Sequence, residues 1–157
     1  MTDSPQTGSA QTGGRLLVIF DGHCGLCNRA VRWFLTRDQQ DRLRFVPSES
    51  EKVAGLLARH GFGARDAVSG HGTIPRTILV VRDPGASTEC VLNRSDAVVA
   101  LLGELPRPWP AVGVALGVIP RPLRDLGYRI VARWRYHIWG RLETCPLPTA
   151  EERSRFL

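Results

Sequence analysis

The stretch from residue 15 to residue 35 restricts what this chain can fold into more than any other part of the sequence. Its apolar run, Leu16–Phe20, ends in an Asp-Gly turn, which is typical of a buried strand. The motif Cys24-Gly25-Leu26-Cys27 follows, and beyond it apolar residues recur at spacings of three and four, which indicates a helical face. The sequence therefore predicts a strand and a turn that place a C-x-x-C pair in the first turn of a helix.

Strand and helix patterns alternate as far as residue 105. A capping box of Ser48 and Glu51 predicts the start of a second helix. Asn93 or Ser95 can cap a third. The resulting order, β-α-β-α-β-β-α, combines two parallel strands with an antiparallel hairpin and helices on both faces. We therefore predict an α/β fold with a thioredoxin-like three-layer core. Its further strands are expected at 43–46, 77–81 and 90–92.

We expect one domain in three parts: a disordered tail over residues 1–14, a core over 15–105 and a helical C-terminal extension over 106–157 that packs on the core. The tail is polar and has almost nothing to bury. The last long helix of the extension has an apolar stripe at helical spacing, which we expect to pack on the core while the arginines beside it face solvent. The stripe consists of Leu123, Leu126, Ile130, Trp134 and Ile138.

Composition limits location and partners. The chain has 157 residues and a formal net charge of +6, almost all of the positive charge being arginine. No apolar run approaches the roughly 20 residues of a membrane span, and the first residues lack the features of a signal peptide. We therefore expect a cytoplasmic protein without a transmembrane segment and without a specific nucleic-acid partner. Peripheral contact between the basic helix and an anionic membrane surface remains an alternative.

The C-x-x-C pair predicts dithiol chemistry. A thiol attacks a disulfide only as the thiolate, and unpaired N–H groups at a helix start lower a cysteine pKa. Cys24 occupies that position, so we expect it to be an exposed nucleophile, with Cys27 one turn further on as the resolving thiol. The partners would be protein or small-molecule thiols and disulfides. We expect no cofactor beyond the Cys24–Cys27 disulfide.

A metal site is the main chemical alternative for the pair. Structural zinc needs two further close ligands, whereas Cys90 and Cys145 are far apart in the sequence. We therefore expect no metal. Cys90 is interpreted as a buried strand residue. Cys145, in a proline-flanked segment, is either an accessory redox thiol or inert.

Further residues near the pair are candidates for tuning or substrate contact. Asp21 either caps the turn or exchanges a proton with Cys27. His23, Gly25 and Leu26 adjoin the cysteines. The pair Ile74-Pro75 enters the third predicted strand, where a proline would lie across from the C-x-x-C and leave backbone free to pair with an extended substrate.

The pattern Asp21-x-x-Cys24-x-x-Cys27 within FDGHCGLCNRAVRWFL resembles the signature of the DCC thiol-disulfide oxidoreductase family. The resemblance continues through RSDAVVALL, IPRPLRDLGYRIVARWRY and GRLETCPLPTAEERSRFL, and so covers nearly all of the chain beyond the tail. It implies a thioredoxin-like fold and dithiol–disulfide exchange, with the two cysteines as the redox pair and Asp21 as the third signature residue. Cys145 matches a cysteine often seen near the end of the family's sequences.

Thioredoxins themselves are a more distant comparison. Ile74-Pro75 is similar to their cis-proline element, but Leu26 stands where they have a proline, and that position tunes the reduction potential. Two hypotheses result. The first is a thiol-disulfide oxidoreductase; the alternative is a non-enzymatic module that binds a metal through the C-x-x-C or docks on a partner or membrane surface through its basic helix.

Overall fold

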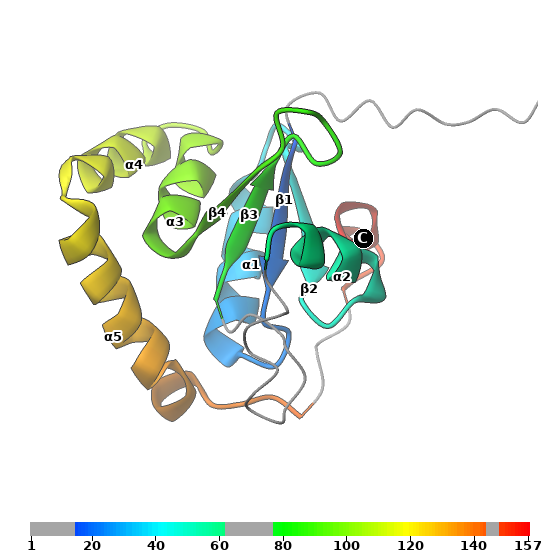
Figure 1. The fold of residues 1–157 in the computed structure, drawn as a ribbon. Coiled ribbons are helices and arrows are strands. Elements are labelled where there is room, and N and C mark those ends of the chain that lie inside the picture. Colours follow the sequence, from blue (N-terminus) through cyan, green and yellow to red (C-terminus); the bar gives the residue numbers. More distant parts are fainter. Residues whose placement is uncertain (1–14, 62–76, 144–147) are drawn as a thin grey trace, which may run out of the picture.

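A four-stranded sheet is at the centre of the computed structural model, which describes residues 15–61, 77–143 and 148–157 (Figure 1). The strand order is β2-β1-β3-β4. β1 pairs in parallel with β2 and antiparallel with β3, which in turn pairs antiparallel with β4. This is the mixed sheet expected of a thioredoxin-like α/β fold. The strands are β1 (Leu16–Phe20), β2 (Leu43–Pro47), β3 (Leu79–Arg82) and β4 (Cys90–Asn93).

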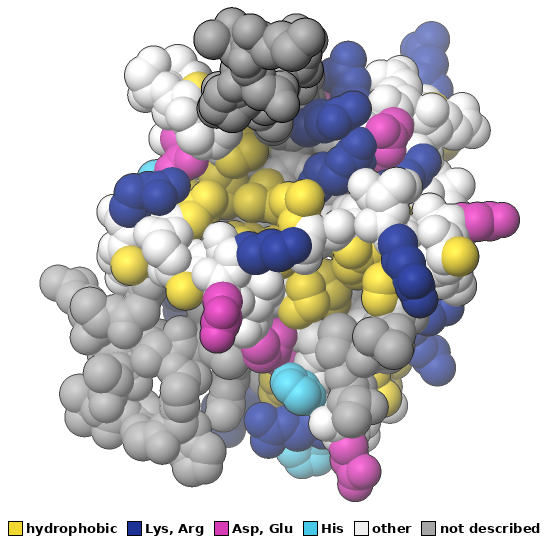
Figure 2. Space-filling view, turned by 90° about the vertical axis from the view of Figure 1, so that its right-hand side faces the viewer, with side chains coloured by type: hydrophobic (Ala, Val, Ile, Leu, Met, Phe, Trp, Pro, Cys, Tyr) yellow, Lys and Arg dark blue, Asp and Glu magenta, His cyan; other side chains and the backbone are white. Residues whose placement is uncertain are grey.

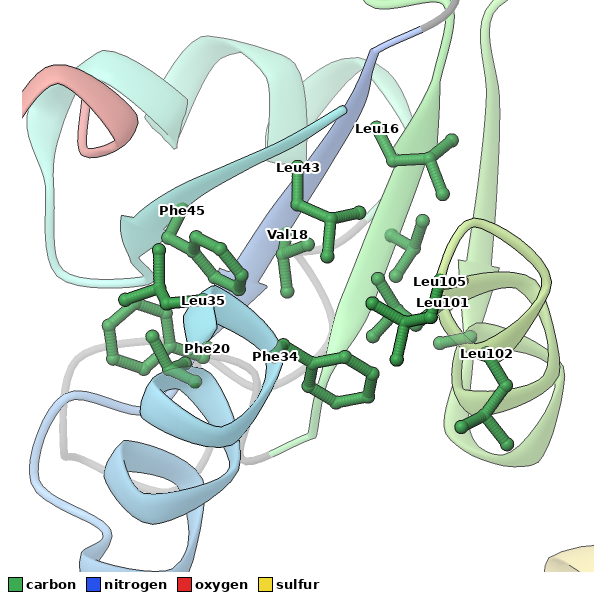
Figure 3. Packing of buried hydrophobic residues seen from close by; sticks show 13 residues of the cluster. Leu16, Val18, Phe20, Phe34, Leu35, Leu43, Phe45, Leu101, Leu102 and Leu105 are labelled. Carbon is green, nitrogen blue, oxygen red and sulfur yellow. The ribbon is translucent and has the colours of Figure 1, made fainter. Parts of the chain in front are cut away.

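Helices cover both faces of the sheet. The apolar side chains of β1 point alternately to one face and to the other, so each face needs helices to cover it. Val18 and Phe20 face α1 and α3 in one core cluster, while Leu17 and Ile19 face α2 in the other. Figure 3 shows the first cluster, where Phe34 of α1 and Leu101 of α3 point toward the sheet. The helices are α1 (Gly25–Arg37), α2 (Glu51–Arg59), α3 (Arg94–Gly103), α4 (Trp109–Val118) and α5 (Arg121–Trp139), with a short 3-10 helix at Glu152–Arg155.

The C-terminal residues return to the far edge of the sheet. Phe156 forms a parallel bridge with Phe45, and Leu157 N–H donates to the Phe45 carbonyl at 3.0 Å. Figure 2 shows this side of the molecule, with hydrophobic side chains gathered near its centre and arginine and lysine side chains among and around them. The basic charge of the chain is therefore not confined to α5.

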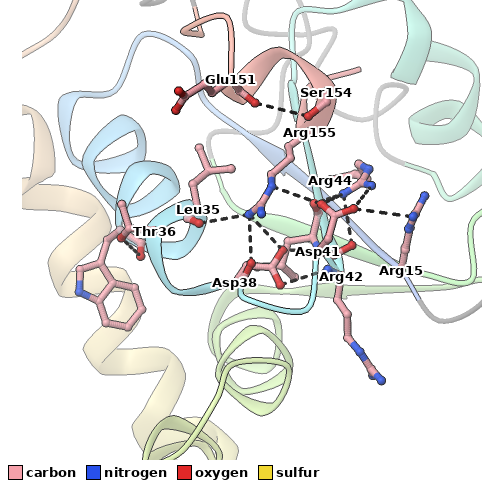
Figure 4. A network of polar contacts seen from close by, with 12 residues as sticks. Arg15, Leu35, Thr36, Asp38, Asp41, Arg42, Arg44, Glu151, Ser154 and Arg155 are labelled. Atoms are coloured by element: carbon pink, nitrogen blue, oxygen red, sulfur yellow. Dashed lines mark hydrogen bonds and ion pairs between the residues drawn. The ribbon is translucent and has the colours of Figure 1, made fainter.

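Asp38 and its neighbours fix the connection between α1 and β2 (Figure 4). The buried Asp38 carboxylate accepts the backbone N–H of Arg42 at 3.1 Å and of Leu43 at 2.9 Å. Arg155 Nη1 lies 3.6 Å from a carboxylate oxygen of Asp38 and donates to the carbonyls of Asp38 and Leu35, both at 3.1 Å. One buried carboxylate thus joins the end of α1, the start of β2 and the C-terminal 3-10 helix.

The predicted start of the second helix was wrong. Ser48 does not cap α2, because its N–H donates to the Phe20 carbonyl at 2.8 Å and continues the pairing of β1 with β2. The helix therefore begins at Glu51, with Ser50 as its N-cap and the Ser50 hydroxyl accepting the Lys52 N–H. Of the two residues proposed to cap the third helix, Asn93 is the N-cap of α3, without a side-chain bond.

The interpretation of Cys90 as a buried residue was also wrong. Cys90 is exposed because it begins β4, the edge strand of the sheet. Its Cα partner on β3, Arg82, is exposed as well. An apolar run of three residues does not distinguish an edge strand from a central one.

The apolar stripe of α5 faces solvent rather than the core. Its five side chains are 53–63% exposed, which contradicts the expected packing. α5 instead packs on α1 and α3 with its opposite face, which carries Arg124, Tyr128 and Arg135. The physical reason is that the part of the core beneath α5 contains buried or half-buried carboxylates. These carboxylates need cationic or hydroxyl partners, and α5 supplies them. Among the described residues, no helix has the length and apolar character needed to cross a membrane.

Candidate active site at the start of α1

The C-x-x-C pair lies where the sequence predicts it, in the turn between β1 and α1. Cys24 is the N-cap of α1 with an extended backbone, φ −91° and ψ 118°. Its Sγ accepts the backbone N–H of Cys27 at 3.3 Å, so it takes the place that a serine or aspartate oxygen fills at other helix starts. Both cysteines are free thiols, and the structure represents the reduced pair.

The two thiols are electrostatically unequal. The pKa of Cys24 is lowered from 9.0 to about 6, mainly because the Cys27 thiol donates a hydrogen bond to its sulfur. The Cys27 N–H and the positive charge of Arg135 act in the same direction, against the effect of burial. The pKa of Cys27 is raised, because its thiol is the donor in this bond and because its partial burial disfavours the charged form. The pair thus holds one thiolate, on Cys24, and one proton, on Cys27.

Cys24 is not exposed, contrary to the sequence prediction. Its exposed fraction is 0%. Residues 139–142, which we call the closing segment, lie over it: Arg141 forms an antiparallel bridge with Cys24, and Leu142 N–H donates to the His23 carbonyl at 2.8 Å. Cys27, by contrast, is only partly buried. A contact from more than a hundred residues away therefore decides which sulfur is accessible.

Gly25 permits the close approach of the closing segment. A Cβ atom at this position would lie 2.3 Å from the Trp139 carbonyl oxygen, which is backbone and has little freedom to move away. The Gly25 N–H also points to the Gly140 carbonyl at 3.4 Å. Gly25, predicted only as a tuning or substrate-contact residue, is thus a point of contact between α1 and the chain beyond α5.

His23 joins the same contact. Its ring nitrogen Nδ1 lies 3.1 Å from the Leu142 carbonyl, and Nε2 lies 3.9 Å from a carboxylate oxygen of Glu49. The side chain therefore links the turn before Cys24 both to the closing segment and to the residues that precede α2.

Asp21 forms a buried network with two residues of α5. One carboxylate oxygen accepts the His23 N–H at 3.0 Å, as expected for a turn-capping aspartate. The other is bound by the Tyr136 hydroxyl and by Arg135 Nη2 at 3.3 Å. The pKa of Tyr136 is raised to about 12 by burial and by the bond to Asp21, so the phenol remains a donor. Both carboxylate oxygens of Asp21 thus accept hydrogen bonds.

Arg135 connects this network to the redox pair. Its Nη1 lies 3.5 Å from the Cys27 Sγ, and the side chain is almost fully buried. Its Nε–H has no partner among the described residues. Sequence reasoning missed both Arg135 and Tyr136. The only available signal was indirect: a buried aspartate after a strand needs a cationic partner, but the sequence does not say which arginine of the chain reaches it.

A cavity of about 380 Å³ adjoins the pair between α1, α3, α4 and α5. Cys27 and Leu26 form part of its wall, whereas Cys24 does not. Most of the remaining wall is apolar, including Phe34, Val98 and Leu116. Leu26, predicted as a tuning residue, is thus also a cavity residue.

Three predicted site residues, Ile74, Pro75 and Cys145, lie outside the described residues. Within the described ranges, no three His, Cys, Asp or Glu side chains gather in an arrangement that would hold a metal ion.

The sequence model of the DCC1-like thiol-disulfide oxidoreductases matches residues 18–141. The chain belongs to this DCC1-like family. The matched region includes Asp21 and both cysteines, and it extends through α5 to Arg141 of the closing segment. Residues 139–141 of the closing segment in this DCC1-like protein are thus within the matched region.

Two relatives support this membership. The uncharacterized protein YuxK of Bacillus subtilis is 32% identical over 149 residues, which is 95% of this chain and 98% of the relative. A DCC family protein of Arabidopsis thaliana, named as chloroplastic, is 31% identical over 133 residues, or 85% of this chain and 70% of the relative. No solved structure matches this DCC1-like protein.

Proposed function

We propose that the protein is an enzyme of dithiol–disulfide exchange that uses Cys24 and Cys27 as its redox couple. The observation that carries the proposal is the geometry of the pair: Cys24 is the N-cap of α1, and its sulfur accepts the Cys27 N–H at 3.3 Å. Hydrogen bonds from Cys27 lower the pKa of Cys24 to about 6, while the pKa of Cys27 is raised. A thiolate available at neutral pH is the reactive form in exchange. The family name points to the same class of reaction.

The net reaction transfers two electrons. One cysteine sulfur attacks the substrate disulfide, so that an enzyme–substrate disulfide forms and one substrate thiol leaves. The other cysteine then attacks the enzyme sulfur, the Cys24–Cys27 disulfide forms, and the second substrate thiol leaves with a proton. The reduced couple becomes oxidised, the substrate disulfide is reduced to two thiols, and no further cofactor is needed.

Arg135 is the residue placed to support charge on the couple. Its guanidinium lies between the Asp21 carboxylate and the Cys27 sulfur. When Cys27 loses its proton during exchange, the negative charge on its sulfur therefore lies beside the Arg135 guanidinium. Asp21 and Tyr136 act through Arg135 as positioning residues, and a proton exchange between Asp21 and Cys27 would require one of the present Asp21 bonds to break.

The test is disulfide reductase activity with a chemical thiol as electron donor. Cys24→Ser and Cys27→Ser should each abolish activity, while Cys90→Ser, which removes an exposed thiol away from the pair, should leave it unchanged. Mass spectrometry should show a Cys24–Cys27 disulfide that forms and is reduced reversibly. Full activity in Cys24→Ser, or stoichiometric zinc in the purified protein, would contradict the proposal.

We also propose the cytoplasm as its location, since a reducing compartment keeps such a pair available as a dithiol.

A second candidate function, docking on an anionic membrane surface, is favoured by the exposed stripe of α5. Six large apolar side chains that face solvent lie on α5, and four more belong to residues 112–119. The exposed Arg129 and Arg133 also lie on α5, and its one acidic residue, Asp125, is bonded to Ser95 on α3. Apolar side chains with arginines beside them suit an anionic lipid interface.

Co-sedimentation with vesicles tests the second candidate. The protein should sediment with vesicles that contain an anionic phospholipid and much less with neutral ones. Replacing Ile130 and Trp134 by serine should abolish sedimentation, while the same change at Val91, on β4, should not. Equal sedimentation of the unmodified protein and of the variant with serine at positions 130 and 134 would contradict docking through α5.

A further inference from the structure

The cavity and the redox pair share a wall, and the sulfur in that wall is Cys27. Cys24 has an exposed fraction of 0% beneath the closing segment and takes no part in lining the cavity. A molecule that enters the cavity therefore meets Cys27, whose sulfur lies 3.5 Å from Nη1 of Arg135, another residue of the wall, without any movement of the closing segment. This order of access is the reverse of the one predicted from the sequence.

The rest of the cavity suits an apolar guest. Its volume, about 380 Å³, is within the range of small-molecule sites, roughly 300–1,000 Å³. Two polar side chains in the wall have partners elsewhere: the Tyr128 hydroxyl binds Thr77 Oγ1 and the Ile78 N–H, and the Ser95 hydroxyl binds a carboxylate. The guanidinium groups of Arg124 and Arg135 pair with Asp96 and Asp21, although the Nε atom of each has no partner among the described residues. The thiol of Cys27 is thus the reactive group that this cavity presents.

We propose that the cavity binds the apolar group of a small disulfide substrate and that Cys27, not Cys24, forms the enzyme–substrate disulfide. The proposal rests on the exchange function above and names its substrate class. The substrate has the form R–S–S–R, where R is a small apolar group that occupies the cavity beside Leu26 and Phe34.

The reaction begins with the proton that the two sulfurs share. When this proton moves from Cys27 to Cys24, the Cys27 thiolate attacks the nearer substrate sulfur. A disulfide bond forms between Cys27 and the S–R group, the substrate S–S bond breaks, and RS⁻ leaves and takes up a proton from water. Cys24 then loses its proton and attacks the Cys27 sulfur. The Cys24–Cys27 bond forms, the second RS⁻ leaves and is protonated, the couple is oxidised by two electrons and the substrate becomes two RSH molecules.

Two features support this order. Arg135 Nη1 lies 3.5 Å from the Cys27 sulfur, so the negative charge that develops there has a cation beside it. In the reverse direction an apolar thiol attacks Cys27 and expels Cys24, and a thiolate with a pKa of about 6 is a good leaving group.

A matched pair of disulfides tests the apolar preference. Dipropyl disulfide and bis(2-hydroxyethyl) disulfide differ only in a terminal methyl group instead of a hydroxyl. The reduced protein should prefer dipropyl disulfide about tenfold, relative to the ratio given by a free small thiol, because the cavity buries the methyl group and leaves a hydroxyl unpaired. A ratio equal to that of the free thiol would overturn the apolar assignment.

Cavity-filling variants locate the preference. Ala132→Phe places a ring in the wall and should return the ratio to that of the free thiol, while Ala115→Phe, the same change at an exposed position on α4 outside the cavity, should not. Gly127→Leu in the wall and Gly117→Leu outside it form a second pair, and a Cβ atom added at either glycine has no heavy atom within 4 Å. Circular dichroism and the Tm identify variants that do not fold. A preference that survives both fillers would overturn the proposed site.

Trapping identifies the sulfur. In a background with Cys90 and Cys145 replaced by serine, Cys24→Ser should accumulate a propylthio group on Cys27 faster than Cys27→Ser accumulates it on Cys24, as measured by peptide mass spectrometry. Equal or opposite rates, or no adduct on Cys27, would overturn the inference while leaving exchange by the couple intact. Loss of the exchange function itself would appear separately, as no reversible Cys24–Cys27 disulfide in the unmodified protein.

Discussion

Replacing Gly25 by alanine should uncover Cys24. The added Cβ would lie 2.3 Å from the Trp139 carbonyl oxygen, about 1 Å closer than an ordinary contact allows, so the closing segment must move away. Two backbone hydrogen bonds hold that segment, from Gly25 to Gly140 and from Leu142 to His23. At ~1 kcal/mol each they contribute about 2 kcal/mol, and their loss corresponds to about a 30-fold larger open population.

Alkylation by iodoacetamide measures this opening. In the unmodified reduced protein at pH 8, Cys24 should react much more slowly than the exposed Cys90, despite its lower pKa. Gly25→Ala should increase the rate at Cys24 by about 30-fold, as read by peptide mass spectrometry. Gly55→Ala is the matched control, because that helical glycine has no atom within 4 Å of an added Cβ. The reasoning is refuted if Cys24 in Gly25→Ala reacts at the unmodified rate, or if Cys24 in the unmodified protein reacts as fast as Cys90.

Four further results are expected. The free energy of unfolding of the reduced protein should rise between pH 6 and pH 9, because the pKa of Cys24 is lowered from 9.0 to about 6 in the folded protein and the unfolded chain therefore binds more protons in this range. Below pH 6 this contribution is absent. Above pH 9 the free energy of unfolding should decline again, because the pKa of Cys27 is raised in the folded protein. Urea unfolding across this range should show the slope, and Cys24→Ser should remove it; an unchanged slope in that variant would contradict the assignment. Arg135→Met should raise the pKa of Cys24, seen as an upward shift in the pH profile of alkylation, and should destabilise the fold by about 3 kcal/mol because a buried carboxylate loses its cation. Asp38→Ala should lower the free energy of unfolding by about 2–3 kcal/mol, since two backbone N–H groups lose their acceptor; an unchanged urea midpoint would show that the turn does not depend on it. Trp134→Ser should change the free energy of unfolding by less than about 1 kcal/mol, whereas a loss of 3 kcal/mol or more would mean that the stripe is packed after all.

Short-range features of the site could be predicted from the sequence. The apolar run, the Asp-Gly turn and the C-x-x-C are consecutive, so the strand, the turn and the helix start follow from contacts between near neighbours. The mixed sheet followed from the alternation of patterns and from the rules of chain connection. The prediction of a capping box at Ser48 was wrong because a contact distant in sequence intervened. The Ser48 N–H donates to the Phe20 carbonyl, so the sheet extends through Ser48 and the helix begins later, at Glu51.

The orientation of α5 shows why the rest could not be predicted. Its periodicity identifies an apolar stripe, but the same periodicity describes a stripe that faces the core and one that faces solvent. The choice depends on the buried Asp21, which is far away in sequence and needs Arg135 and Tyr136 as partners. A helix that satisfies buried carboxylates turns its polar face inward and leaves its apolar stripe outside.

The sequence alone therefore determined that a cysteine pair begins α1 at the end of a buried strand, because that arrangement depends on local pattern. Only the tertiary structure decided which sulfur is accessible. Trp139 to Leu142 cover Cys24, and Cys27 faces the cavity beside Arg135. Access to a thiol and the charge beside it depend on segments that meet only when the chain is folded, and no local pattern encodes them.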